Sequence, residues 1–257
     1  MAVPSTEPDR GDPDDTGRPR ARHRHRKPRE RKKGSFWREL PVLVLTALVL
    51  TFLIQTFLAR VYVIPSASME QTLHGCTGCT NDRVLVDKVT YRLGDPAPGD
   101  VVVFRGPESW AGSAEFDAPE PDNLLLRGLQ EAASLIGLAP PDERDFVKRV
   151  IAVGGQTVAC CDDLNRVLVD DRPVTEPYVY LAGGRPQEAF PAVTVPEGNL
   201  WVMGDNRNNS ADSRRHVDDD ADGTIPIGSV IGEARLIVLP PTRWDGIADP
   251  DPQRERR

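Results

Sequence analysis

The sequence has few histidines, few cysteines and only one long apolar run, and each scarcity restricts what the chain can do. Of its 257 residues, four are histidine and four are cysteine. His23 and His25 lie in a basic leader, which leaves His74 and His216 for chemistry in the rest of the chain. Neither lies in a motif typical of a Ser-His-Asp triad, so that mechanism is not expected. The negative mean hydropathy, −0.40, argues against a polytopic membrane protein.

Charge is segregated along the chain. The net charge of −7 argues against a nucleic-acid partner. Residues 1–39 nevertheless carry 12 Lys/Arg against 7 Asp/Glu, or +5, so the remainder carries −12. Arg18–Lys33 contains ten basic residues and one acid, Glu30. Such a segment fits a nucleic-acid-binding arm, a solvated tail or a positive-inside signal. The apolar run that follows favours the positive-inside signal, carried by a cytoplasmic, disordered tail over 1–39.

The apolar run extends from Leu40 to Ala59, and 15 of its 20 residues are apolar while none is charged. At about 1.5 Å per residue it makes roughly 30 Å of helix, the thickness of a bilayer core. One alternative is a buried core helix. The other is a cleaved signal peptide, because Ser66-Ala67-Ser68 resembles a small-x-small cleavage site. The run is longer than a signal peptide's apolar region, which favours an uncleaved, single-pass transmembrane helix over 40–59. The basic flank then predicts a cell-membrane protein with a cytoplasmic N-terminus and an extracytoplasmic domain.

Beyond Arg60, short β-branched runs alternate with turn residues, which predicts a mainly antiparallel β domain over 60–247. An insert at about 107–144 breaks this pattern, because apolar residues at helical spacing predict a helix over 123–138. We expect a disordered C-terminal tail over 248–257. The candidate strands are Arg60–Val63, Arg83–Lys88, Asp100–Phe104, Val147–Val153, Arg166–Val169, Leu200–Met203 and Ile231–Val238.

All four cysteines, Cys76, Cys79, Cys160 and Cys161, fall in the predicted outer domain. Structural disulfides are expected in an oxidising compartment, and four cysteines allow three complete pairings. A zinc site that uses all four thiolates is awkward, because the adjacent Cys160 and Cys161 poorly suit two tetrahedral positions. The sequence leaves the pairing open.

Four blocks of sequence resemble one family. They are Ile64–Leu73 (IPSASMEQTL), Arg83–Phe104 (RVLVDKVTYRLGDPAPGDVVVF), Lys148–Val158 (KRVIAVGGQTV) and Gly204–Arg214 (GDNRNNSADSR). In this order they resemble the type I signal peptidases, in their actinobacterial form, from the apolar run to about Trp244. The resemblance implies a membrane-anchored serine endopeptidase that cleaves N-terminal signal peptides after small-x-small motifs. It implies no cofactor and no metal. The partners would be exported preproteins and the lipid bilayer, without nucleic acid.

The resemblance assigns the nucleophile to Ser68 and the general base to Lys148, a serine–lysine dyad. A lysine removes a proton only when it is neutral, and burial in a dry pocket disfavours its ammonium form. The backbone N–H of Ser68 and the hydroxyl of Ser66 would form the oxyanion hole. Further family roles fall on Ser210, which would orient the lysine, and on the supporting ion pair Asp212 and Arg214.

Shallow apolar pockets would select small side chains before the scissile bond. The residues that the resemblance assigns to these pockets are Tyr62, Ile64, Met69, Leu73, Phe146 and Val147. The chain departs from many family members at Ala67, Gln71 and Gln156, and none of these replaces a proposed dyad residue.

Two other functions compete with this hypothesis. The related self-cleaving repressor proteases share the dyad, but they carry a DNA-binding domain and no transmembrane anchor. The other alternative is a non-catalytic anchored protein built around a thiol or metal site. It predicts that Cys76 and Cys79 matter and that Ser68 does not.

Overall fold

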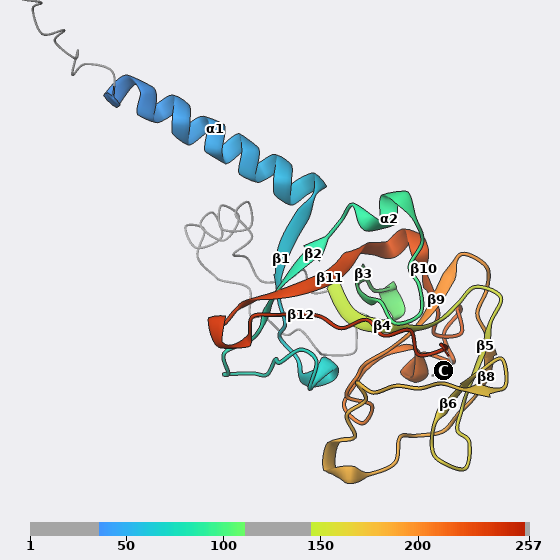
Figure 1. Ribbon diagram of the computed structural model, residues 1–257. Coiled ribbons are helices and arrows are strands. Elements are labelled where there is room, and N and C mark those ends of the chain that lie inside the picture. Colours follow the sequence, from blue (N-terminus) through green and yellow to red (C-terminus); the bar gives the residue numbers. More distant parts are fainter. Residues whose placement is uncertain (1–35, 111–144, 255–257) are drawn as a thin grey trace, which may run out of the picture. The chain divides into compact units, whose positions relative to one another are not determined.

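A computed structural model describes residues 36–110 and 145–254, with side chains from Glu39 onward. The chain divides into two compact units, 1–42 and 43–257. Helix α1 covers Phe36–Phe57 (Figure 1) and so begins four residues before the predicted span. Glu39–Phe57 is the helix in the described residues that is long and apolar enough to cross a membrane, and its apolar side chains are exposed. A buried core helix is therefore excluded.

The second unit is built on a large antiparallel sheet with the strand order β1-β2-β11-β3-β4-β9-β10, in which β12 also pairs with β11. β-Branched residues dominate its inner strands, as in the VVVF of β3, and such residues suit a pleated, buried surface. The strands are β1 (Ala59–Val63), β2 (Arg83–Asp87), β3 (Val101–Arg105), β4 (Asp145–Val153), β9 (Asn199–Met203), β10 (Ile225–Pro226), β11 (Val230–Leu239) and β12 (Asp245–Gly246).

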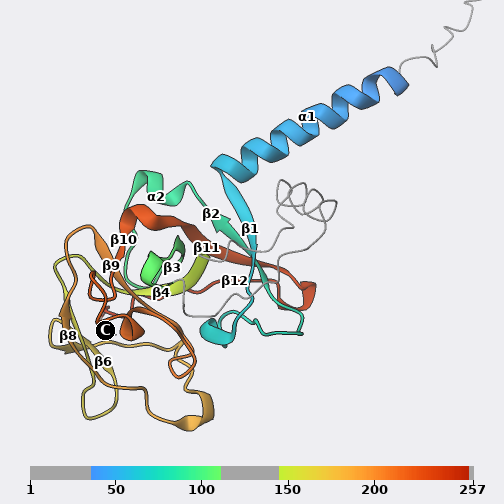
Figure 2. The same cartoon turned by 180° about the vertical axis from the view of Figure 1, so that it is seen from behind.

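A smaller antiparallel sheet has the order β7-β6-β5-β8. Figures 1 and 2 show it at the opposite end of this unit from β1 and β12. Its strands are β5 (Thr157–Cys160), β6 (Val167–Val169), β7 (Arg172–Pro173) and β8 (Phe190–Thr194). Single helical turns connect the strands of both sheets: α2 (Thr90–Leu93), η1 (Ala67–Met69), η2 (Glu108–Trp110), η3 (Ala182–Gly184), η4 (Ser213–Arg215), η5 (Ile227–Ser229) and η6 (Pro241–Arg243).

Strand β3 separates two apolar cores, because successive side chains of a strand point to opposite faces. Val101 and Val103 pack in a core with residues of β1, β2 and β11, whereas Val102 and Phe104 pack with residues of β4, β9 and β10. All four are fully buried, so both faces of the sheet are covered here.

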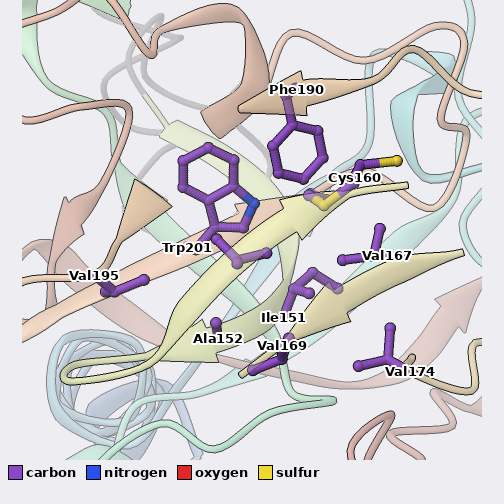
Figure 3. Close-up of a cluster of buried hydrophobic side chains, with 11 residues drawn as sticks. Ile151, Ala152, Cys160, Val167, Val169, Val174, Phe190, Val195 and Trp201 are labelled. Atoms are coloured by element: carbon purple, nitrogen blue, oxygen red, sulfur yellow. The ribbon is translucent and has the colours of Figure 1, made fainter. Parts of the chain in front are cut away.

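A third core joins the large sheet to the small one. Ile151 of β4 and Trp201 of β9 pack against Val158 of β5 and Phe190 of β8 (Figure 3). The rings of Phe190 and Trp201 stack with their centroids 5.3 Å apart. Burying two aromatic side chains of this size fixes the small sheet against the end of β4 and β9.

The predicted mainly β, antiparallel class with one N-terminal apolar helix is confirmed, and each predicted strand appears within about two residues of its expected bounds. Strands β5, β7, β8, β10 and β12 are additional: β7, β10 and β12 have only two residues each, β5 has four, and β8 contains Pro191. The predicted helix over 123–138 lies outside the described residues, as does most of the insert at about 107–144.

The prediction of a disordered tail from residue 248 is wrong for residues 248–254. The Ala248 carbonyl accepts a hydrogen bond from the Arg149 guanidinium (2.9 Å), and the Pro252 carbonyl accepts one from the Thr175 N–H (2.8 Å). The Gln253 side chain donates to the carbonyl of Ile151 (2.9 Å). The polar composition of this segment suggested solvation, but the buried Arg149 and the Thr175 N–H use its carbonyl groups as acceptors.

Candidate active site

Ser68 lies on the 3₁₀ turn η1, a few residues after β1. Ser66 caps this turn: its Oγ accepts from the Ser68 N–H at 3.5 Å and donates to the Ser68 Oγ at 3.2 Å. Pro65 precedes the cap and holds the chain extended there. Ser68 is 3% exposed, so its hydroxyl is nearly removed from solvent. The turn therefore gathers two hydroxyl groups and one backbone N–H around a single point.

Lys148 lies in the middle of β4 and reaches this point from 80 residues away in sequence. Its Nζ donates to the Ser68 Oγ at 2.8 Å, and the residue is 1% exposed. Phe146 and Val150, two residues before and after it, share its face of the strand and are buried. The structure thus brings the predicted nucleophile and the predicted base together in a buried environment.

Asp205, directly after β9, connects the strand of the lysine to the segment of the serine. Its carboxylate accepts from the Nε and one terminal nitrogen of Arg149 (2.9 and 2.8 Å) and from the Thr72 Oγ1 (2.6 Å). Arg149 and Asp205 are both fully buried. Burial by itself would lower the pKa of Arg149, but the hydrogen bonds and charge of Asp205 outweigh this and raise it. Arg149 therefore keeps its charge, and its hydrogen bonds to Asp205 hold neighbouring segments in register.

Asn206 fastens the serine turn directly. Its backbone N–H donates to the Ser68 carbonyl at 3.0 Å, and its side-chain amide donates to the Ala67 carbonyl at 2.9 Å. Asp205 and Asn206 of the GDN turn therefore both bond to the segment that carries Ser68.

The remainder of the GDNRNNSADSR segment folds around a second buried ion pair. Asp212 accepts from the Gly204 N–H at 2.9 Å and from the Nε and one terminal nitrogen of Arg214 at 2.8 and 2.7 Å. Burial raises the pKa of Asp212, but Arg214 and the Gly204 N–H more than offset this, so the pKa falls below its ordinary value. Ser210 is buried beside Gly204. Its expected role in orienting Lys148 stays a prediction.

Most of the residues predicted to line the substrate pocket gather in one core. Tyr62, Ile64, Met69 and Leu73 are buried together, and Val147 packs at their margin. Phe146 differs, because it stacks on Phe104 and meets Trp110 edge-on in the neighbouring core. The cluster lies beside the serine turn, since Met69 is part of that turn, and its role in substrate selection stays a prediction.

His74 and His216 pair with side chains other than Ser68. The His74 ring pairs with Glu70, and the His216 ring pairs with Asp219 at 3.1 Å and stacks on Trp110.

Two groups of side chains in the described residues have the spacing of metal ligands. One is His74, Cys76 and Cys79. The other is Asp100, Glu233 and Asp249. In the second group Glu233 is paired with Arg235 at 2.8 Å, and burial together with the charge of Asp100 raises its pKa to about 7. The cysteines form two pairs in the structure, Cys76–Cys79 and Cys160–Cys161. Formation of these bonds in the isolated protein stays a prediction.

Several residues that shape the site were missed in the sequence. Arg149 and Thr72 hold Asp205, and Gly204 allows close packing around Ser68. The sequence did contain one signal: an arginine in the middle of the apolar strand FVKRVIAV needs a buried acidic partner. Its partner could not be chosen from the many acidic residues without the fold.

Gly204 provides a test of this packing. A Cβ at this position would collide with the Ser210 Oγ and lie 2.5 Å from the Ser68 carbonyl oxygen. We expect Gly204→Ala to lower the free energy of unfolding by about 1–3 kcal/mol, the usual cost of overpacking. The matched control is Gly228→Ala, because a Cβ there meets nothing within 4 Å. Thermal denaturation of both variants checks this, and equal melting temperatures would contradict it.

The comparisons with known proteins agree with this geometry. The sequence profile of the family described as "Signal peptidase, peptidase S26" matches residues 37–239. The chain is 48% identical over 237 residues to signal peptidase I of Mycobacterium tuberculosis, covering 87% of this chain and 80% of that protein. It is 45% identical over 244 residues to the probable signal peptidase I of Mycobacterium leprae (87% and 83% covered). The probable signal peptidase I-1 of Synechocystis is 37% identical over 211 residues (81% and 86% covered).

These matches extend over most of the chain, and the family match over residues 37–239 includes each block on which the resemblance was based. They confirm the family and, with it, a serine peptidase activity on signal peptides. The chain belongs to the signal peptidase family, peptidase S26, as a bacterial type I signal peptidase of the actinobacterial form.

Proposed function

We propose that this signal peptidase is a membrane-anchored endopeptidase that cleaves with a Ser68–Lys148 dyad. The observation that carries the proposal is the 2.8 Å hydrogen bond between the Lys148 Nζ and the Ser68 Oγ, two groups that are almost completely buried. A serine hydroxyl at this distance from an amine in a dry site meets the geometric requirement for general-base activation.

In the proposed reaction, neutral Lys148 takes the proton of the Ser68 hydroxyl while the Oγ attacks the carbonyl carbon of the scissile peptide bond. The tetrahedral oxyanion receives hydrogen bonds from the Ser68 N–H and the Ser66 hydroxyl. When the C–N bond breaks, the Lys148 ammonium gives its proton to the departing amine of the mature protein. Lys148 then takes a proton from water, whose oxygen attacks the acyl-serine ester, and the proton returns to Ser68 as the signal peptide leaves.

The proposed substrates are exported preproteins with small-x-small residues before the cleavage site. Two observations support this. The apolar cluster of Tyr62, Ile64, Met69 and Leu73 adjoins the serine turn, so apolar surface lies next to the proposed nucleophile. β1 is the terminal strand of the large sheet in the described residues, and the chain runs from it directly to Ser66. An extended peptide added beside a terminal strand would bring its backbone to Ser68.

We further propose that α1 anchors the chain in the cell membrane, with the basic leader 1–39 in the cytoplasm and the β domain outside. The apolar, uncharged stretch in α1 and the excess of basic residues before it support this topology. An anchor beside the site would hold the enzyme in the same bilayer as the apolar segment of its substrate. The lipid bilayer is then a partner, and nucleic acid is not.

The dyad is tested with Ser68→Ala and Lys148→Met on cleavage of a preprotein in detergent. Each substitution should lower the rate by about 10⁴-fold or more, because the nucleophile and its base act as a unit. Lys88→Met is the matched control: Lys88 is the other lysine in the described part of the chain, and it bonds the Gln55 carbonyl instead. The dyad assignment does not survive if either dyad variant keeps near-normal activity while its melting temperature is unchanged.

The role of Ser66 is tested separately. Ser66→Ala should lower kcat by about 10²–10³-fold and change KM little, because an oxyanion donor acts on the transition state. Ser229→Ala is the control, because that hydroxyl donates to the Pro226 carbonyl of its own turn at 2.7 Å. An unchanged kcat would remove Ser66 from the oxyanion hole.

The proposed topology is tested by adding protease to intact spheroplasts that express the chain with an epitope at its N-terminus. The β domain should be digested while the epitope stays protected, because the basic leader is retained inside. Permeabilised cells, in which both are digested, provide the control. A digested epitope with a protected β domain would reverse the assignment.

A further inference from the structure

The cluster of His74, Cys76 and Cys79 has no part in the proposed reaction, although it follows the serine turn closely. One ligand atom from each residue lies within 4.8 Å of the others, and all three side chains are half-buried. Cys76 and Cys79 have the C-x₂-C spacing that is common in zinc sites. This differs from a site built on all four cysteines, because Cys160 and Cys161 belong to the core of the small sheet.

The loop that carries the cluster is held by contacts other than its disulfide. The His74 N–H donates to the buried Asp82 carboxylate at 2.8 Å, and Asp82 is in turn paired with Arg243 at 2.8 Å. The Cys76 N–H donates to the Asn81 side chain at 3.0 Å. These bonds remain when the two cysteines are thiols, so the reduced loop keeps its ligands close together.

The loop is also pressed against the segment that leads to the proposed nucleophile. A Cβ at Gly75 would lie 2.6 Å from the carbonyl oxygen of Ser66 and 2.9 Å from the carbonyl carbon of Ile64. Gly75 therefore permits a close backbone contact between the loop and this segment.

The donor set suits zinc. Two thiolates and one imidazole form a Cys₂His set, and the two negative charges balance those of Zn²⁺. The Nδ1 of His74 is hydrogen-bonded to Glu70, so a metal at this site would take the other ring nitrogen, Nε2. A carboxylate that fixes a histidine in this manner recurs behind metal-bound histidines in proteins.

We propose that His74, Cys76 and Cys79 form a zinc site when the two cysteines are reduced, with a water molecule in the fourth position. The Cys76–Cys79 disulfide recorded in the structure excludes the metal. An external dithiol converts the disulfide to two thiols by supplying two electrons and two protons, and it becomes a disulfide itself. Zinc then displaces the two thiol protons. The site is independent of the Ser68–Lys148 proposal.

The test uses the full chain in detergent, in a His23→Ala/His25→Ala background that removes the histidines of the leader. One portion is reduced with dithiothreitol and desalted without oxygen, and the other stays oxidised. Each is titrated with ZnCl₂ against a chromophoric chelator. We expect one zinc per reduced chain and none per oxidised chain. Co²⁺ in place of zinc should give the thiolate charge-transfer band and the visible bands of a tetrahedral site.

Matched variants identify the ligands. Cys76→Ser/Cys79→Ser should abolish binding, whereas Cys160→Ser/Cys161→Ser should leave it unchanged. His74→Ala should weaken binding by at least about tenfold, and Glu70→Gln by about 10–100-fold, the usual effect of losing a carboxylate behind a ligand. Melting temperatures identify any variant that fails to fold.

Two outcomes overturn the proposal without relying on a variant. One is a reduced chain whose four thiols are verified by mass spectrometry and which binds no zinc. The other is a Co²⁺ complex without a thiolate charge-transfer band. Binding that follows Cys160 and Cys161 instead would also overturn it.

Discussion

The buried Asp205 carboxylate is the interaction on which the arrangement of the site depends. It joins Arg149 of the lysine's strand to Thr72 of the serine's segment, and the next residue, Asn206, bonds the serine turn itself. A buried ion pair earns little net stability over an apolar pair, yet removing one partner typically costs about 3–5 kcal/mol. We therefore infer that the pair acts chiefly to specify the register of these segments, because a shifted register would leave both charges unpaired.

The two apolar cores on the faces of β3 explain why a directional interaction such as this ion pair is needed. β3 is covered on both faces, and Lys148 is surrounded by the same apolar packing that buries Phe146 and Val150. Apolar contacts are non-directional, so they exclude water without fixing where a single amine points. Two ion pairs supply directional contacts: Arg149–Asp205, which follows Lys148 in β4, and Arg214–Asp212, which holds the Gly204 N–H. The exclusion of water from Lys148 and the orientation of its amine thus have separate origins in this domain.

The C-terminal segment 248–254, which lies beyond the family match ending at residue 239, also takes part in this hydrogen bonding. The Ala248 carbonyl accepts from the same guanidinium that holds Asp205, and Gly99 allows the backbone at Pro250 to approach it closely. A segment without regular structure thereby completes the hydrogen bonding of a fully buried arginine. Composition alone suggested a solvated tail. Every residue has a backbone carbonyl group, so the residue types do not reveal which carbonyl groups accept hydrogen bonds from the domain.

Local patterns in the sequence determined the helix over α1, most strands of the large sheet and the residue types of the site. Those signals are carried by residues close together in the chain: an uncharged apolar run, β-branched strands and short motifs. Only the tertiary structure decided that Lys148 meets Ser68 and that Arg149 is paired with Asp205. These pairings depend on strand order and on the burial of charge. Both are set by packing between segments tens of residues apart, which periodicity within a single segment does not encode.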